Sequence, residues 1–326
     1  MTSTTGSMRA VMHARYGGPE VLTLASIDRP RPGRGEVLVA VHASTVNRTD
    51  CGLRAATPFI SRFFTGLLKP KHTTVGSEFA GVVEELGTEV EEFAVGDHVF
   101  GVTIEANAEF VRVRAAGAIT TMPDGLTFEE TAPIGDGGIL ALACLDQSGV
   151  RSGQRIVIYG ASGAIGTAAV QLAKHRGAHV TAVTDTARVD LVRSLGADEV
   201  IDYTVEDFTT NGQRYDVVLD AVGKHSYRRC RHSIVKGGVF ATTDLGFAWH
   251  VPPLTLLSRV VGPHRVRLPI PTYNKANLLE IKAAVEAGAL RAIIDRSYPL
   301  TEFAEATCYV ETGHKTGNVV LVIAPA

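Results

Sequence analysis

Short apolar runs broken by glycine and proline fill the first third of the chain. Between Arg9 and about Val113 they include VLTLASI, EVLVAVHAS, FAGVVEELG and GDHVFGV. Alternating runs of this length, bounded by turn residues, are typical of β-strands in an antiparallel lobe. The pattern therefore predicts a first lobe that is mainly β.

The pattern changes after Met122. Thr127 and Glu130 have the spacing of a capping box, in which a threonine caps a helix and a glutamate follows three residues later. Apolar strands then alternate with helical segments: RIVIYG, GTAAVQLAKHRG, HVTAVTD, ARVDLVRSLG, EVIDY, YDVVLDAVG, a basic helix and GGVFATTD. This alternation predicts βαβ units and a parallel sheet buried on both faces.

The C-terminal part again contains both helical and strand-like segments. It predicts an amphipathic helix over residues 277–287, a strand over 293–300, a further helix and a last strand over 319–323. Its β content suggests that this part rejoins the first lobe. The pattern thus predicts an α/β chain in which a doubly wound parallel-sheet domain is inserted into a mainly β domain.

Composition and charge narrow the function classes. The 326 residues suggest about two domains, and 45% hydrophobic with 20% charged residues is ordinary for a globular protein. A net charge of -2 gives no basic excess, so nucleic acid is not expected as a partner. The four cysteines form no CxxC pair, no apolar run is long enough for a membrane span, and residues 1–8 look like a disordered leader. We expect a cytoplasmic protein with no membrane partner.

A glycine-rich turn is the clearest chemical motif. Gly160, Gly163 and Gly166 follow an apolar strand and open an alanine-rich helix. Such a turn brings backbone N–H groups and a helix N-terminus onto a pyrophosphate, whereas glycine spacing alone matches many tight turns. The strand-turn-helix context therefore predicts a dinucleotide site. The proposed site residues are Gly160, Ala161, Ser162, Gly163, Ala164, Ile165 and Gly166.

Residues after the next strand bear on the choice between NADH and NADPH. Asp185 lies 19 residues after Gly166, where a carboxylate bonds the ribose 2′-OH and favours NADH. Arg188 and Tyr203 point the other way, since a guanidinium and a phenol can bind a 2′-phosphate. Arg188 fits equally well as an exposed charge at a helix start, so the residues alone leave the choice open.

Many ordered segments resemble the medium-chain dehydrogenase/reductases, and among them the zinc-independent quinone oxidoreductase (zeta-crystallin-like) branch. The matching segments are GGPEVL, RPRPGRGEVLVAVHASTVNRTD, VGSEFAGVVEELG, FAVGDHVFG, YGASGAIGTAAVQLAK, LVRSLGADEVIDY and GHKTGNVVLVI. The resemblance implies a GroES-like catalytic domain over residues 9–122 and 272–326. It also implies a Rossmann-like NAD(P)-binding domain over residues 123–271.

The same resemblance argues against zinc. Alcohol dehydrogenases of the superfamily hold a catalytic zinc with side chains at the positions that match Asn47, Ser77 and a residue near Asp136. Asparagine and serine are poor zinc ligands, and the segment with four close cysteines that holds a structural zinc is missing. We therefore expect neither metal.

The family pattern also assigns roles around the cofactor. Asn47 matches the asparagine of N-x-x-D-x-x-x-R, which lies beside the nicotinamide; a loop-capping asparagine is the alternative. Arg188 and Tyr203 match residues that contact the 2′-phosphate in NADPH-dependent members, so the resemblance favours NADPH. Asp185 and Asn318 depart from that pattern and keep NADH possible.

Without a metal to polarise a carbonyl, a substrate that delocalises the incoming charge is expected. A quinone or an α,β-unsaturated carbonyl would accept hydride and then be protonated by water or an acid. Asp136 is the candidate acid, with an N-cap for a helix over residues 137–144 as the alternative. Asp244 could face the nicotinamide or serve as a strand-end turn residue.

Two segments depart from the family and could select a small hydrophobic substrate: residues 57–72, and residues 247–271 with the only tryptophan. Either could instead pack on its own protein or on a second subunit, and HRVRLPIP could be the edge strand of a homodimer. Two other functions fit the sequence. One is an enoyl reductase that tailors a specific metabolite, and the other is a crystallin-like protein that binds NADPH without turnover.

Overall fold

The computed structural model describes residues 6–245, 251–258 and 260–323. The chain divides into two compact units. Unit 1 comprises Met1–Asp136, Tyr273–Glu286 and Ile294–Ala326, and unit 2 comprises Gly137–Thr272 and Ala287–Ile293. Both ends of the chain therefore belong to unit 1, and unit 2 is inserted between them.

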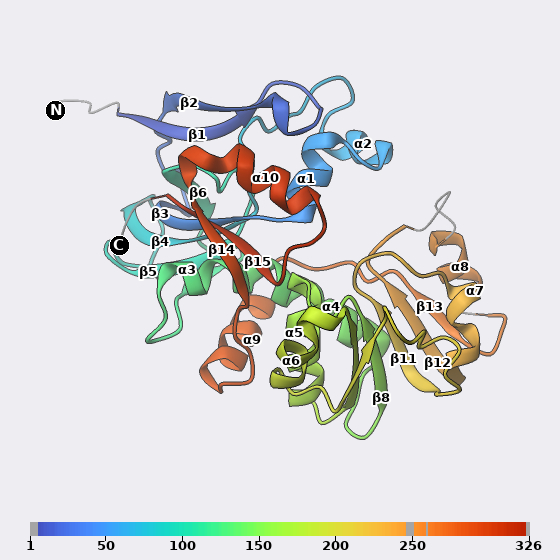
Figure 1. Cartoon of the computed structure of the whole chain (residues 1–326). Coiled ribbons are helices and arrows are strands. Elements are labelled where there is room, and N and C mark those ends of the chain that lie inside the picture. The colour runs from blue at the N-terminus through green and yellow to red at the C-terminus, as the bar shows by residue number, and fades with distance from the viewer. Residues whose placement is uncertain (1–5, 246–250, 259, 324–326) are drawn as a thin grey trace. The chain divides into compact units, whose positions relative to one another are not determined.

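Unit 1 contains a two-stranded antiparallel ribbon and a larger mixed sheet (Figure 1). Strands β1 (Ser7–His13) and β2 (Leu22–Asp28) pair as a ribbon. The larger sheet has the order β14-β15-β3-β4-β5-β7, with β6 also paired to β3. Its strands are β3 (Glu36–Val46), β4 (Glu78–Leu86), β5 (His98–Val102), β6 (Phe110–Arg114), β7 (Ile119–Thr121), β14 (Ile294–Pro299) and β15 (Asn318–Val322).

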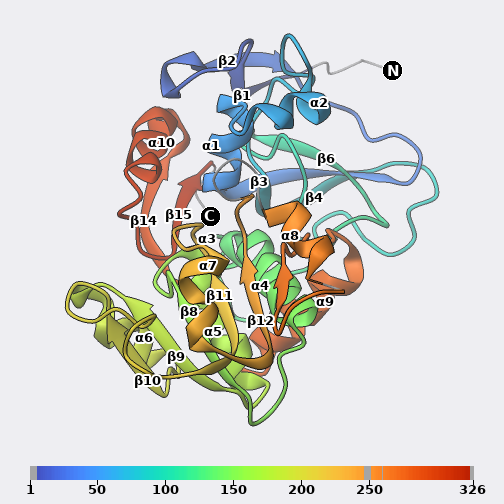
Figure 2. The ribbon, with the colours of Figure 1, turned by 90° about the vertical axis from the view of Figure 1, so that its right-hand side faces the viewer.

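The C-terminal strand returns to the first lobe, as the sequence predicts. Strand β15 pairs antiparallel with β3, with Val319 opposite Val46. Figure 2 shows the red β14, β15 and α10 (Phe303–Glu311) beside the blue α1 (Arg48–Ala55) and β3. Apolar residues from both ends of the chain, such as Val41, Phe79 and Leu321, form one core. This core fixes the end of β3, where the candidate site begins.

Unit 2 is built on one parallel sheet, in the order β10-β9-β8-β11-β12-β13. Its strands are β8 (Arg155–Tyr159), β9 (His179–Thr184), β10 (Glu199–Asp202), β11 (Tyr215–Asp220), β12 (Ile234–Thr242) and β13 (Arg265–Arg267). Figure 1 shows α5 (Ala164–His175) and α6 (Val189–Ser194) on one side of this sheet, and α7 (Tyr227–Cys230) and α8 (Val251–Leu257) on the other. The predicted doubly wound α/β fold with a GroES-like lobe is confirmed.

The other helices follow local signals. The capping box of Thr127 and Glu130 forms at α3 (Phe128–Thr131), with both reciprocal hydrogen bonds. A 14-residue helix, α4 (Gly135–Ser148), follows, and α9 (Lys275–Glu286) covers most of the predicted residues 277–287. Short helices over residues 57–72 are η2 (Phe59–Ser61) and α2 (Arg62–Thr65). No helix of the described chain has both the length and the apolar character needed to cross a membrane.

Two expectations differ from the structure. Strand β1 begins at Ser7, and Met8 is buried, so residues 7 and 8 do not belong to a disordered leader. The units divide between Asp136 and Gly137, whereas the sequence placed the boundary at residue 122. The boundary shifts because the α3 segment and the start of α4 pack on unit 1, which places Asp136 in that unit.

Candidate active site

Asn47 lies where β3 ends and α1 begins. It is the N-cap of α1, and its Oδ1 accepts a hydrogen bond from the backbone N–H of Asp50 at 2.8 Å. Asn47 therefore caps a helix through its side-chain oxygen, as the alternative reading of its role predicted. The amide nitrogen is directed elsewhere, because Nδ2 donates to Ser77 Oγ at 2.7 Å and to Asp136 Oδ2 at 3.4 Å. Helix capping thus orients the amide group toward these two residues.

Asp136 lies in the first turn of α4. The helix begins at Gly135, one residue earlier, so the alternative that Asp136 caps a helix starting at residue 137 is wrong. Its side chain is 5% exposed, and Oδ1 accepts a hydrogen bond from the hydroxyl of Tyr273 at 2.5 Å. The two residues are 137 positions apart, and no motif in the sequence marks Tyr273 as a site residue.

Glu78 joins this group from the first residue of β4. Its Oε2 accepts from the backbone N–H of Asp136 at 2.7 Å, and its Oε1 accepts from Thr45 Oγ1 at 2.7 Å. Glu78 is 1% exposed. We call Asn47, Asp50, Ser77, Glu78, Asp136 and Tyr273 the polar cluster. All six belong to unit 1.

Three carboxyl groups in a buried cluster repel one another and lose hydration, which favours their protonated forms. Burial, and then the neighbouring charge of Asp136, raise the pKa of Asp50 to about 7. The same two causes raise the pKa of Glu78, and burial raises that of Asp136. The polar cluster can therefore hold protons near neutral pH.

These raised pKa values predict that the protein loses stability as pH increases. For Asp50, the folded state binds the proton more tightly than the unfolded state, whose pKa is near 3.8. The stability that protonated Asp50 contributes to the folded state is thus fully present below about pH 4 and is lost as pH rises through about 7. We expect Asp50→Asn to remove a pH-dependent change on the order of 2–4 kcal/mol in the free energy of unfolding.

Denaturant unfolding at about pH 5 and about pH 8 measures this change. The exposed Asp190, which lies outside the cluster, provides the control Asp190→Asn. Equal pH dependence in Asp50→Asn and the native protein would contradict the assignment to Asp50.

The glycine turn in unit 2 connects β8 to α5 and leaves no room for side chains at two positions. Gly160 has a φ of +78°, in the left-handed region. A Cβ on Gly166 would lie 2.0 Å from the carbonyl oxygen of Gly160. Gly163 is the N-cap of α5, so the first amide groups of Ala164, Ile165 and Gly166 stand at the helix N-terminus. Such a backbone cradle fits a pyrophosphate.

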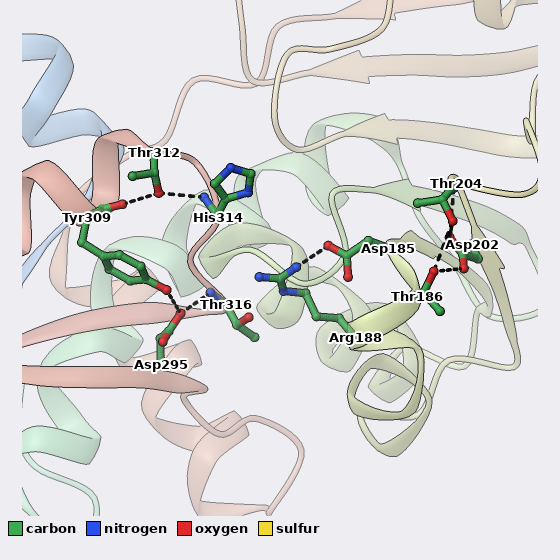
Figure 3. A network of polar contacts seen from close by, with 10 residues as sticks. All are labelled: Asp185, Thr186, Arg188, Asp202, Thr204, Asp295, Tyr309, Thr312, His314 and Thr316. Atoms are coloured by element: carbon green, nitrogen blue, oxygen red, sulfur yellow. Dashed lines mark hydrogen bonds and ion pairs between the residues drawn. The ribbon is translucent and has the colours of Figure 1, made fainter.

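Asp185 and Arg188, the two residues with opposed cofactor signals, pair with each other at the end of β9 (Figure 3). Arg188 Nη1 donates to Asp185 Oδ2. The Asp185 Oδ1 atom is buried and has no hydrogen-bond partner among the described residues. On the neighbouring strand, Asp202 accepts from Thr186 and Thr204, which fixes the start of this turn. The end of β9 thus offers both an acceptor and a cation.

Tyr203 and Asp244 occupy other strand ends of unit 2. Tyr203 directly follows β10, is 49% exposed, and its ring lies 6.0 Å from that of Tyr159. Asp244 follows β12 by two residues, and its backbone N–H donates to Thr242 Oγ1 at 3.3 Å. Asp244 is exposed and lies beside Gly223, where a Cβ would come within 2.5 Å of the Asp244 Cβ. Both residues therefore lie just beyond the carboxyl ends of parallel strands, where ligands of such sheets bind.

The two divergent segments differ in what the structure describes. Residues 57–72 expose aromatic side chains, including Phe63 and Phe64, and Arg62 lies over the rings of Tyr16 and Phe59. In the second segment, Trp249 lies outside the described residues. Its later part forms α8 and β13, and β13 is the edge strand of the unit 2 sheet. HRVRLPIP therefore contains an edge strand, as predicted.

The positions that match zinc ligands are connected by hydrogen bonds, since the Asn47 amide contacts both Ser77 and Asp136. Within the described parts of the chain, no group of three or more His, Cys, Asp or Glu side chains is arranged to hold a metal ion.

Two family matches cover successive parts of the chain. Residues 33–150 match the alcohol dehydrogenase GroES-like domain, and residues 195–321 match the zinc-binding dehydrogenase family. The chain is 32% identical to the mitochondrial NAD(P)H oxidoreductase RTN4IP1 of Mus musculus, over 98% of this chain and 91% of the relative. It is 30% identical to the chloroplastic NADPH-dependent alkenal/one oxidoreductase of Arabidopsis thaliana, over 98% of this chain and 80% of the relative.

A solved structure resembles the whole chain. The quinone oxidoreductase from Coxiella burnetii superimposes with a TM-score of 0.87 at 26% identity, over 98% of this chain and 100% of the other. These matches and the inserted parallel-sheet unit define an oxidoreductase that uses a nicotinamide cofactor. The chain belongs to the medium-chain dehydrogenase/reductase superfamily, in its zeta-crystallin-like quinone oxidoreductase branch.

Proposed function

We propose that this protein is an NAD(P)H-dependent reductase that passes hydride to a quinone or an α,β-unsaturated carbonyl without zinc. The names of its relatives support the reaction class, since they include a quinone oxidoreductase and an alkenal/one oxidoreductase. The polar cluster carries the proposal. There, the Asn47 amide bonds to the Ser77 hydroxyl and the Asp136 carboxyl, and the family resemblance matches Asn47, Ser77 and a residue near Asp136 to zinc ligands.

The cofactor would be held mainly by unit 2. The pyrophosphate would bind to the first N–H groups of α5, beside Gly160 and Gly166, which have no side chains. Asp185 and Arg188 would contact the adenosine ribose. Tyr203 and Asp244 complete the proposed set at the neighbouring strand ends, and Asn47 would position the nicotinamide. When bound, the nicotinamide supplies the hydride. The chain supplies binding, orientation and a proton.

We further propose that NADPH is preferred and NADH accepted. The Arg188 guanidinium can donate to a 2′-phosphate, whereas the unpartnered Asp185 Oδ1 can accept from a 2′-OH. We expect Arg188→Ala to weaken NADPH binding by roughly 10- to 100-fold, because a charged hydrogen bond contributes about 1.5–3 kcal/mol. NADH binding should change less than about threefold. Fluorescence titration of both cofactors measures these affinities.

Asp185→Ser is the reciprocal variant for the same pair. It removes a negative charge beside the proposed phosphate and leaves Arg188 in place, so the NADPH to NADH preference should increase. Arg193→Ala, which removes another arginine of the α6 turn with an exposed ion pair, is the control. If Arg188→Ala weakened both cofactors equally, the 2′-phosphate role of Arg188 would be wrong.

The substrate class follows from what the polar cluster can do. Hydride addition leaves negative charge on the substrate, and quinones and enones delocalise it over a conjugated system. Asp136 would then donate the proton that completes the reaction, since burial raises its pKa and favours the protonated form. The exposed aromatic residues of 57–72 would contact a small hydrophobic substrate.

One assay separates the proposed function from the alternatives. Consumption of NADPH and of NADH is followed with 1,4-benzoquinone, 9,10-phenanthrenequinone and an alkenone. We expect NADPH-dependent reduction of quinone or enone. Turnover of one alkene with no activity on quinones would indicate a dedicated enoyl reductase. Tight NADPH binding with no turnover of any substrate would indicate a binding protein.

A homodimer is the proposed assembly. Strand β13 (Arg265–Arg267) is the last strand in the order of the unit 2 sheet among the described residues, and edge strands can pair with a second copy. Light scattering gives the mass in solution. A monomer at micromolar concentration would contradict this assembly.

A further inference from the structure

The segment between α1 and β4 presents large apolar side chains to solvent. Phe63, Phe64, Leu67 and Leu68 lie in α2 or directly after it and are 55–90% exposed. Burial of such side chains is strongly favourable, so four exposed within six residues indicate a surface that another molecule covers. We call these four residues the apolar tip.

Polar contacts on the inner side of the same segment hold the apolar tip in place. The hydroxyl of Tyr16 donates to Gly66 O at 2.7 Å and lies 2.8 Å from Thr65 Oγ1. The backbone N–H of Lys71 donates to Thr65 O at 2.7 Å, which closes a loop around the two leucines of the tip. Figures 1 and 2 show α2 beside α1 in unit 1. The segment thus binds unit 1 through polar atoms and leaves its apolar side chains outside, the reverse of the usual arrangement.

The charges next to the apolar tip are mostly positive. No Asp or Glu occurs over residues 51–77, whereas Arg62, Lys69 and Lys71 flank the tip. Both lysines are exposed. Glu105 reaches the end of the segment, where it pairs with a histidine at 3.3 Å. Apolar side chains beside exposed cations are typical of a peripheral contact with an anionic lipid bilayer.

A second copy of the chain fits this surface less well than a bilayer does. In a symmetric dimer the same patch meets itself, so Lys69 and Lys71 of both copies would face one another and repel. Anionic lipid headgroups instead attract these cations, and the apolar region beneath the headgroups takes up aromatic and leucine side chains. Charge complementarity therefore favours lipid.

The loop that carries the apolar tip also shares a pocket of unit 1 with the candidate site. Thr65 and Pro70 of the loop line this pocket, and so do Asp50 and Ser77 of the polar cluster. A lipid surface at the apolar tip would thus lie close to the candidate site.

We propose that the apolar tip inserts into the headgroup region of an anionic lipid bilayer, with Lys69 and Lys71 on the lipid phosphates, and that the enzyme takes lipophilic quinones or enones from that bilayer. The bilayer contact stands on the exposure and charge of the segment, and the substrate class rests on the proposed function. A peripheral contact needs no membrane-spanning helix, so this proposal replaces the expectation from the sequence that the protein has no membrane partner.

Sedimentation with lipid vesicles tests the contact without any activity. We expect the native protein to bind vesicles of phosphatidylcholine mixed with phosphatidylglycerol at least roughly tenfold more tightly than vesicles of phosphatidylcholine alone. Salt should release it. Leu68→Ser should weaken binding to the mixed vesicles roughly tenfold, because it removes apolar area from the contact. The double variant Lys69→Glu/Lys71→Glu should weaken it at least roughly tenfold, because it reverses two charges.

Val205→Ser and Lys236→Glu are the matched controls, because they make the same kinds of change at exposed positions of unit 2. Both should bind vesicles as the native protein does. Absence of vesicle binding, equal binding to the two compositions, or the same loss in the controls would overturn the proposal. A lipid-free dimer that dissociates in Leu68→Ser, measured by light scattering, would assign the apolar tip to a second copy and also overturn it.

Kinetics separate this inference from the proposed function. With a benzoquinone that carries a long alkyl chain, dispersed in the mixed vesicles, Lys69→Glu/Lys71→Glu should lower kcat/KM roughly tenfold, whereas water-soluble 1,4-benzoquinone should be reduced at the native rate. Equal rates of variant and native enzyme on the vesicle-borne quinone would overturn uptake from the bilayer. A native enzyme that reduces soluble quinones and does not bind vesicles would overturn the inference and leave the function intact. A native protein that binds vesicles and reduces no quinone or enone would overturn the function and leave the bilayer contact.

Discussion

Gly166→Ala should disrupt both the fold of the turn and the binding of the cofactor. The new Cβ would lie 2.0 Å from the carbonyl oxygen of Gly160 and 2.8 Å from the Cα of Ala161. Both contacts are with backbone, so α5 has to move away from the end of β8. Overpacking of this kind destabilises by roughly 1–3 kcal/mol, and displacement of the helix N-terminus should weaken NADPH binding at least roughly tenfold.

Gly163→Ala is the matched variant in the same turn. A Cβ there meets only the Gly160 carbonyl oxygen at 3.5 Å, and Gly163 has a φ of -80°, which alanine adopts readily. We expect its thermal stability to change by less than about 0.5 kcal/mol. If the middle glycine allows close approach of the pyrophosphate, Gly163→Ala should lose affinity while its stability is kept.

Thermal unfolding of the cofactor-free protein and fluorescence titration with NADPH distinguish these effects. Gly166→Ala should lose both stability and affinity, and Gly163→Ala only affinity. Normal stability and normal binding in Gly166→Ala would contradict the geometry of the turn.

Features that depend on nearby residues could be predicted from the sequence. The glycine turn needs only a strand, three glycines and a helix within a short stretch, and the capping box of Thr127 and Glu130 needs only four residues. The structure has both. Strand alternation likewise predicted the parallel sheet, because strands buried on both faces have continuous apolar sequences.

Contacts between distant residues could not be predicted in this way. The oxygen of Asn47 caps α1 through a local signal, but the direction of its amide nitrogen depends on Ser77 and Asp136, which come from other elements. Asp136 can be singled out from the sequence, because it is a carboxyl group within a run of glycines, Gly135-Asp136-Gly137-Gly138. Its partner Tyr273 follows a stretch with no regular pattern, and only the folded chain brings the two together.

Two residues that favour different cofactors in the sequence can form one structural feature in the fold. Asp185 and Arg188 favoured different cofactors when considered separately. In the structure they form one ion pair, which leaves a carboxylate oxygen and guanidinium nitrogens at the same strand end. The three-residue spacing across the start of a short helix allows this contact. The pair is therefore tested by changing each member in turn.

Asp136→Asn should lower the reduction of an α,β-unsaturated ketone by a factor on the order of 100, because general acid catalysis typically contributes about 10²–10⁴-fold. Asparagine keeps the shape of the side chain and an oxygen that can accept from Tyr273, but it has no carboxyl proton to give. Quinone reduction should fall less, since a hydroquinone anion can take its proton from water. Binding of NADPH should change less than about twofold, because asparagine keeps the size and shape of the side chain.

Steady-state kinetics with both substrate classes, together with NADPH titration, measure this prediction. Asp146→Asn is the control, because it changes an exposed aspartate of the same helix, where it pairs with Arg176. Tyr273→Phe removes the hydroxyl that holds Asp136, and we expect an intermediate loss on the enone, because the acid remains but is less well oriented. Full enone turnover in Asp136→Asn would assign the proton to another donor. An equal loss on quinone and enone would indicate that Asp136 supports binding of the substrate rather than its protonation.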